Sequence, residues 1–186
     1  MRTLKYAMLG LIKRGPISGY DISREFSDNA LASFWHARHS QIYPELKRLL
    51  EEGLITYETV IQGEKLEKKV YSLTPLGEAD FKSWLRSDEP LDPTPKDVFR
   101  LRTYYSESLT SSEYLRLLDS QIRQHTARLE ALKETDRHFP ETPPFGTPEH
   151  GDYLVLQGAL MREGAYLNWL ALCRDAFAGK EDPTHE

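Results

Sequence analysis

The stretch that decides the fold runs from His39 to Leu73 and reads HSQIYPELKRLLEEGLITYETVIQGEKLEKKVYSL. Its first part carries apolar residues at helical spacing, which predicts a helix over about 41–52 with Ser40 as its N-cap. Gly53 suits the left-handed residue that ends many helices. Residues 55–61 and 67–73 then alternate with period two, which predicts a hairpin that turns at 62–65.

The flanking segments extend this pattern on both sides. Residues 3–13 form a first amphipathic helix, and Ser18 with Asp21 makes a capping pair for a second helix over 19–27. After the hairpin, Thr74 and Pro75 start a fourth helix that runs to about residue 85. Three helices followed by a hairpin is the order of a winged helix-turn-helix. In that fold the third helix enters a DNA major groove and the hairpin, called the wing, lies along the phosphates.

The second half of the chain reads as a separate helical domain. The segment 86–95 holds three prolines and indicates a linker. A long helix from Thr110 to about His138 has a heptad seam, made by Leu115, Leu118, Ile122, His125, Leu129 and Leu132. Such a seam is typical of a helix that pairs along its length, and we expect it to pair two copies of the chain. The alternative is a buried helix of a monomer. A last helix over about 152–178 is apolar on more than one face.

The predicted fold class is therefore mainly α with a small β-hairpin. We expect an N-terminal winged helix-turn-helix DNA-binding domain over 1–85, a linker over 86–95, and a C-terminal helical dimerisation and effector-response domain over 96–180.

Composition and charge limit which classes of protein this chain can belong to. Hydrophobic residues make up 39% of the chain and charged residues 28%, which is typical of a folded globular protein. One cysteine excludes an internal disulfide and fits a reducing compartment, so we expect a cytoplasmic protein without a membrane span. The net charge is −5, yet residues 1–73 carry 11 Lys and Arg against 9 Asp and Glu, while residues 74–186 carry 13 against 20. A local basic surface can bind phosphates on an acidic protein.

No pattern of an enzyme is present in the sequence. It contains no Gly-x-Ser-x-Gly elbow, phosphate loop or dinucleotide fingerprint, so we expect no catalysis and no cofactor. His36 and His39 have the spacing of metal ligands, but no third ligand is near them in the sequence. The lysines around the wing tip can bind phosphates, although they can also protect an exposed sheet edge from aggregation.

Three stretches carry a family resemblance. LKYAMLGLIKRGPISGYDI (4–22), the stretch from His39 to Leu73 and YSLTPLGEADFKSWL (71–85) resemble the PadR family of bacterial transcriptional regulators. GDYLVLQGALMREGAYLNWL (151–170) resembles the C-terminal domain of larger members. The resemblance implies a homodimer on near-palindromic, double-stranded operator DNA.

The resemblance also implies two sets of site residues. The DNA-facing positions are Ser18, Tyr20, Ser40, Gln41, Tyr43, Lys47, Gln62, Gly63, Lys65 and Lys68. The resemblance also implies an effector pocket between the two domains. Its candidate residues are Trp35, Tyr153, Arg162 and Tyr166, of which the arginine can hold a carboxylate. For each aromatic residue taken singly, plain core packing is the alternative.

The leading hypothesis is a dimeric repressor that a small aromatic (phenolic) acid, such as p-coumaric or ferulic acid, releases from its operator. The resemblance implies control of a phenolic acid decarboxylase gene. Two alternatives remain open: a PadR-like regulator with a different inducer, such as a hydrophobic drug, and a winged-helix adaptor that binds protein.

Overall fold

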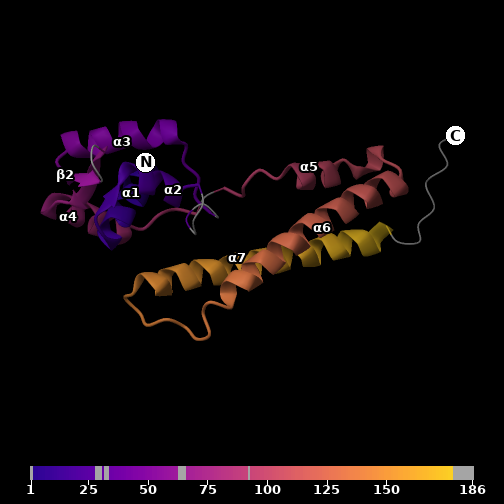
Figure 1. Cartoon of the computed structure of the whole chain (residues 1–186). Coiled ribbons are helices and arrows are strands. Elements are labelled where there is room, and N and C mark those ends of the chain that lie inside the picture. The colour runs from indigo at the N-terminus through magenta and orange to yellow at the C-terminus, as the bar shows by residue number, and fades with distance from the viewer. Residues whose placement is uncertain (1, 28–30, 32–33, 63–65, 92, 178–186) are drawn as a thin grey trace. The chain divides into compact units, whose positions relative to one another are not determined.

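The chain folds into two compact units, residues 1–91 and residues 92–186 (Figure 1). The computed structural model describes residues 2–27, 31, 34–62, 66–91 and 93–177. The boundary between the units falls within the proline-rich segment 86–95. The fold is mainly helical with one small sheet, which confirms the predicted fold class.

The first unit is built on three helices, α1 (Thr3–Arg14), α2 (Gly19–Glu25) and α3 (His39–Glu51). Their apolar faces enclose a core that also receives residues from the start of the hairpin. The buried members are Met8, Leu9, Ile12, Ile22, Phe26, Ile42, Leu46, Leu49, Leu54, Ile55 and Tyr71. Helix α4 (Pro75–Leu85) packs against α1, and the ring of Trp84 stacks on that of Tyr6 with centroids 4.6 Å apart.

The end of α3 has the hydrogen bonds of a Schellman motif. The amide of Leu54 donates to the carbonyl of Leu49 at 2.9 Å, and that of Gly53 donates to Leu50 at 3.0 Å. Gly53 has φ of +67°, a conformation that costs glycine little because it has no Cβ. The predicted left-handed cap is thus confirmed, and it turns the chain from α3 directly into the hairpin.

The start of α3 differs from the prediction. The helix begins at His39 and its N-cap is Arg38, so the assignment of Ser40 as N-cap was wrong. The side-chain carbonyl of Gln41 accepts a hydrogen bond from the Arg38 amide at 2.9 Å. A glutamine at the third helical position can reach back in this way, and it moves the helix start towards the N-terminus.

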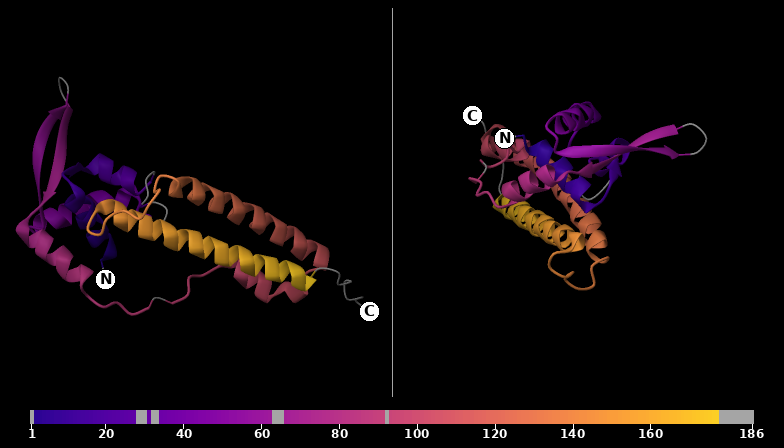
Figure 2. Two further views of the ribbon diagram at one scale, coloured as in Figure 1. Left: turned by 90° about the horizontal axis from the view of Figure 1, so that it is seen from below. Right: turned by 90° about the vertical axis from the view of Figure 1, so that its left-hand side faces the viewer.

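The wing is part of a three-stranded antiparallel sheet. Strands β2 (Ile55–Gln62) and β3 (Leu66–Leu73) pair along their whole lengths, and β1 (Ile17–Ser18) joins the outer side of β3. Ile55 is buried at the base of the hairpin, whereas Ile61 is 70% exposed near its far end. The hairpin therefore projects away from the helices of its unit (Figure 2).

The second unit is an antiparallel helix pair with a short helix packed against it. Its elements are α5 (Val98–Tyr104), a 3-10 turn η2 (Ser106–Ser108), α6 (Ser111–Asp136) and α7 (Pro148–Phe177). Thr110 and Glu113 form the predicted capping box at the start of α6. Helix α7 starts four residues before the predicted position, because the Thr147 hydroxyl accepts from the His150 amide at 3.3 Å and caps the earlier turn.

The heptad seam of α6 packs within its own chain. Leu118 is fully buried, and Leu115 and Ile122 pack against a core that includes Leu170 of α7. The seam thus identified a helix that pairs along its length, and its partner within the chain is α7. Within the described ranges, none of the helices is both long and apolar enough to cross a bilayer.

Candidate nucleic-acid interface

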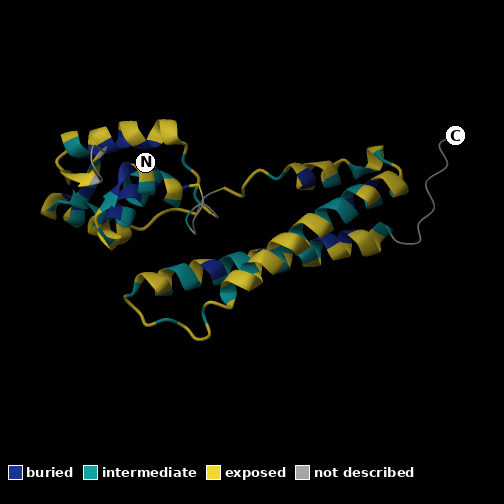
Figure 3. Cartoon of the chain, viewed as in Figure 1, coloured by how far each residue is buried: buried dark blue, intermediate teal, exposed yellow. Residues whose placement is uncertain are grey.

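Helix α3 presents a polar face to solvent. Ile42, Leu46 and Leu49 bury the other face in the core, which leaves the outer surface to polar side chains (Figure 3). The exposed members are Ser40, Gln41, Tyr43, Lys47 and Arg48. This is the geometry that a helix needs to enter a major groove with its polar side chains foremost.

An N-terminal clamp fixes α3 against the start of α1. The Arg2 guanidinium donates to the buried Glu45 carboxylate of α3, with N–O distances of 2.6 and 3.0 Å, and also binds Glu52 beyond the end of that helix. Hydrogen bonds to Glu52 and Glu45 raise the pKa of Arg2 above its usual value. The outer face of α3 is therefore held in a defined orientation.

Side chains from α2, α3 and β3 meet around an open pocket of about 730 Å³. Tyr20 from α2 and Tyr43 from α3 are 64% and 42% exposed. Lys68 from β3 lines the same space. A Cβ atom at Gly19 would lie 3.2 Å from the Tyr43 ring, so glycine lets α2 approach this ring closely. We call Tyr20, Tyr43 and Lys68 the tyrosine–lysine cluster.

Asp21 holds the lysine of this cluster in place. Its carboxylate forms an ion pair with the Lys68 ammonium at 2.8 Å and accepts a hydrogen bond from the Ser18 hydroxyl at 2.6 Å. The bond from Lys68, followed by that from Ser18, lowers the pKa of Asp21. Ser18 also caps α2 by accepting from the Asp21 amide at 3.2 Å, as predicted, and it is only 2% exposed.

The wing carries a second ordered lysine on its other face. Lys69 lies over the Tyr57 ring with its Nζ atom 4.3 Å from the ring centroid. Consecutive strand residues point to opposite faces, so Lys68 meets α2 while Lys69 lies across the strand pair. Both cations are therefore positioned along the hairpin.

The structure brings four of the predicted DNA-facing residues into one place: Ser18, Tyr20, Tyr43 and Lys68. Ser40, Gln41 and Lys47 follow along the exposed face of α3, where Lys47 pairs with Glu51 at 3.8 Å. Gln62 ends strand β2. Gly63 and Lys65 lie outside the described residues. The sequence did not point to Asp21 as a partner of Lys68, because the two are distant in sequence.

The predicted effector residues are divided between the units. Arg162 and Tyr166 line one pocket of the second unit. Tyr153 lies on the same helix about 20 Å before Tyr166, where its ring packs on Phe139 with centroids 5.8 Å apart. Trp35 belongs to the first unit and packs against its core. For the described residues, the structure holds no group of three His, Cys, Asp or Glu side chains that could bind a metal ion.

These features define the class of the protein as a winged-helix DNA-binding protein with an appended helical unit. Residues 8–83 match the model of the transcriptional regulator PadR-like family, and residues 95–178 match that of the virulence activator alpha C-terminal domain. Together with the relative described next, these matches show that the chain belongs to the PadR family.

Bacillus subtilis supplies the relatives that we compare. The chain is 45% identical over 173 residues to its negative transcriptional regulator PadR, which covers 91% of this chain and 94% of that protein. The crystal structure of that PadR in complex with operator DNA matches with a TM-score of 0.90 and 44% identity, over 95% of this chain and 99% of that one. The complex with p-coumaric acid matches with a TM-score of 0.84 and 40% identity, over the same shares. These relatives are regulators and not enzymes, in agreement with the sequence analysis.

Proposed function

We propose that this protein is a cytoplasmic transcriptional repressor that binds near-palindromic operator DNA as a homodimer and leaves it when a phenolic acid binds. The single observation that carries the proposal is the exposed tyrosine–lysine cluster beside the polar face of α3. The operator complex of the 45% identical Bacillus subtilis regulator supports it. The family resemblance of the sequence supports a phenolic acid decarboxylase gene as the regulated gene.

The cluster has the chemistry of a phosphate-binding surface. A tyrosine hydroxyl donates one hydrogen bond to a phosphate oxygen, and a lysine adds a positive charge that releases counterions. Ser40 and Gln41 at the start of α3 carry donors and acceptors that can read base edges in the major groove. The cluster then sets the position of α3 on the duplex, and the α3 side chains provide the sequence preference.

Recognition of a near-palindromic operator requires two copies of the DNA-binding domain, which a dimer supplies. One winged helix contacts one half-site, and a two-fold pair contacts two half-sites about 34 Å apart. The second unit carries exposed apolar side chains that a second copy would cover: Val98, Leu101, Tyr104, Tyr105, Met161 and Leu172. We assign the dimer contact to this unit.

Release requires that the acid bind the DNA-incompetent state more tightly than the DNA-bound state. By linkage, the operator then weakens the binding of the acid by the same factor. A change in the spacing or tilt of the two α3 helices is sufficient, since both must fit successive major grooves.

A gel-shift titration tests the function. The probe is an operator that the protein itself selects from a pool of random duplexes. We expect binding at low ionic strength, and a loss of affinity of about tenfold or more in saturating p-coumarate or ferulate. Unchanged affinity would exclude the phenolic acids as inducers and leave a repressor with another inducer. Failure to select any duplex would exclude the repressor itself and favour a protein-binding adaptor.

A further inference from the structure

The exposed face of α3 carries a cation that the tyrosine–lysine cluster does not include. Arg48 lies in the third turn of the helix, and its side chain is 61% exposed. At 3.6 residues per turn, Arg48 follows Gln41 along one stripe of the helix, and it lies about 140° around the axis from Tyr43. Arg48 and the tyrosine of the cluster therefore lie on opposite flanks of the exposed face.

A buried carboxylate of the same helix anchors Arg48. Glu45, three residues earlier, is only 5% exposed. Its Oε1 atom accepts hydrogen bonds from Nε and Nη2 of Arg2 at 3.0 and 2.6 Å, and its Oε2 atom lies 3.9 Å from Nη1 of Arg48. Arg2 also binds Glu52. Both carboxylates on this side of α3 are thus held by a cation of the fold, which leaves the Arg48 charge directed to solvent.

The neighbouring cation of α3 has a different kind of partner. Lys47 pairs at 3.8 Å with Glu51, whose side chain is 62% exposed, whereas the side chain of Glu45 is 6% exposed. A long side chain loses conformational entropy when a ligand orders it, and a fixed partner reduces that loss. Arginine also presents a planar fork of donors that matches a phosphate. Arg48 is therefore the better preorganised of the two cations.

We propose that Arg48 is a further DNA-contacting residue, that it binds a phosphate on the flank of α3 away from the tyrosine–lysine cluster, and that Glu45 is its positioning residue. A major groove has a sugar–phosphate backbone on each side, so a helix within it can be held from both flanks. This inference rests on the proposed function and adds the contact on the second flank. Neither residue was among the DNA-facing positions that we predicted from the sequence.

The place of Arg48 on the helix favours a phosphate over a base edge. Ser40, Pro44 and Glu51 lie opposite the buried stripe of α3, and Arg48 lies about 50° to one side of that direction. Base edges form the floor of the groove and phosphates form its rims. A long cationic side chain on the flank of the helix therefore meets a rim.

Salt-dependent fluorescence anisotropy tests the contact, with the operator that the protein itself selects and with a random duplex of equal length. We expect Arg48→Gln to lower operator affinity about tenfold, because a charge-assisted hydrogen bond is lost. The plot of log affinity against log salt concentration should become shallower by about one, as one phosphate is no longer neutralised. Affinity for the random duplex should fall by the same factor, since phosphates carry no sequence information.

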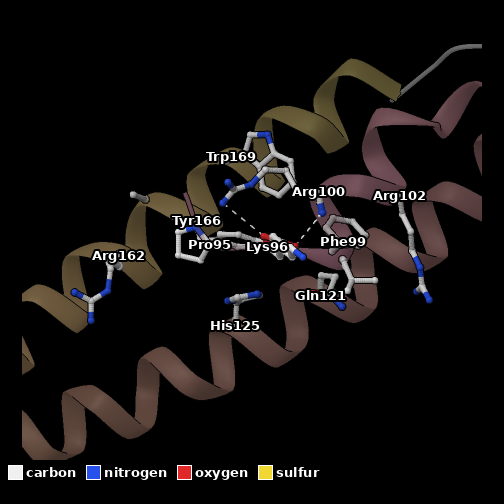
Figure 4. A pocket seen from close by; sticks show the side chains of 13 residues that line it. Pro95, Lys96, Phe99, Arg100, Arg102, Gln121, His125, Arg162, Tyr166 and Trp169 are labelled. Carbon is white, nitrogen blue, oxygen red and sulfur yellow. Dashed lines mark hydrogen bonds and ion pairs between the residues drawn. The ribbon is translucent and has the colours of Figure 1, made fainter. Parts of the chain in front are cut away.

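Two further variants show whether charge and place both matter. Arg48→Lys keeps the charge, so the salt dependence should be that of the unmodified protein, with a smaller loss of affinity because the planar fork is gone. The matched control is Arg137→Gln. Arg137 also follows its glutamate partner, Glu134, by three residues, but it lies in the second unit and does not line the pocket there (Figure 4). This control should leave affinity and salt dependence unchanged.

A double-mutant cycle tests the positioning role of Glu45. We expect Glu45→Gln to lower operator affinity about threefold in the unmodified protein and to have no further effect in the Arg48→Gln background. A residue that only stabilises the fold would cost the same in both backgrounds. Urea unfolding gives the folded fraction of each variant, by which the affinities are corrected. If Glu45→Gln does not fold, Arg2→Gln, at a side chain that is 39% exposed, provides the same cycle.

The outcomes separate the two proposals. If the protein selects an operator while Arg48→Gln leaves affinity and salt dependence unchanged, the contact is wrong and the proposed function stands. If the loss is confined to duplexes with one particular base pair, Arg48 reads a base and the phosphate assignment is wrong. Equal losses in both backgrounds of the cycle would overturn the role of Glu45. If the protein selects no duplex, both proposals are wrong.

Discussion

Asp21 of α2 and Lys68 of the wing form an ion pair, with 2.8 Å between Oδ2 and Nζ, and both line the pocket on the surface that we assign to DNA. The pair has two opposing consequences. It orders the lysine and joins the wing to α2, but it also places a carboxylate where phosphates should bind. The net effect of this ion pair on operator affinity can be measured with a substitution that removes the Asp21 charge and keeps the shape of the side chain.

We expect Asp21→Asn to raise operator affinity about fivefold at low salt, on the order of 1 kcal/mol, because one repulsive charge is lost. Asparagine keeps an acceptor for the Ser18 hydroxyl. The plot of log affinity against log salt concentration should steepen by about one, since Lys68 then neutralises a phosphate.

The control for this variant is Glu78→Gln. Glu78 pairs with Lys13 and Lys82, and these hydrogen bonds, that from Lys13 first, lower its pKa to about 2, so it is as ionised as Asp21 but lies outside the cluster. It should leave the salt dependence unchanged. Equal effects of both variants would show that only net charge matters and that the ion pair has no special role.

Tyr43 should contribute through its hydroxyl. We expect Tyr43→Phe to lower operator affinity about tenfold, because a hydrogen bond to a charged phosphate is worth about 1.5–3 kcal/mol. Tyr57→Phe is the matched control, since Tyr57 is 40% exposed against 42% for Tyr43 and does not line the pocket of the cluster. Fluorescence anisotropy with labelled operator measures both. If Tyr43→Phe left operator affinity unchanged, the Tyr43 hydroxyl would not contribute to DNA binding.

Much of the fold could be predicted from the sequence because its signals are local. The cap of α4 at Thr74, the capping box at Thr110 and the left-handed Gly53 each depend on residues within one turn. Period-two alternation located the wing for the same reason. Helix boundaries were less accurate, since a long side chain such as Gln41 can extend a helix by reaching back.

Features that depend on tertiary contacts could not be predicted. Strand β1 has two residues, too few to show a period, and exists because it pairs with β3. The seam of α6 could not distinguish α7 from a second copy, as both offer an apolar stripe. Ser18 is only 2% exposed, and its hydroxyl donates a hydrogen bond to the Asp21 carboxylate, a contact that the sequence did not predict. The pocket of the second unit is lined by residues of α5, α6 and α7, so it could be located only once the packing of these helices was known.

The pH dependence of stability should report the link between Asp97 and Tyr166. Burial opposes ionisation of Asp97, but the hydrogen bonds from the Tyr166 hydroxyl and the Arg100 amide outweigh it, so its pKa is lowered on folding. A lowered pKa adds stability that is present above the unfolded value of about 3.9 and is lost as the pH falls through the folded value.

We therefore expect Asp97→Asn to lower the free energy of unfolding at pH 7, and the difference from the unmodified protein to shrink below about pH 4. Urea unfolding between pH 7 and pH 3 measures it. A difference that stays constant over this range would mean that the Asp97 charge does not stabilise the start of α5.

Sedimentation velocity of the protein with its selected operator tests the central claim most directly, since mass reports both stoichiometry and release. The account predicts two chains per duplex at low ionic strength, and free duplex after addition of p-coumarate. A chain that stays single at every concentration, or that leaves the duplex unbound at low ionic strength, would contradict it.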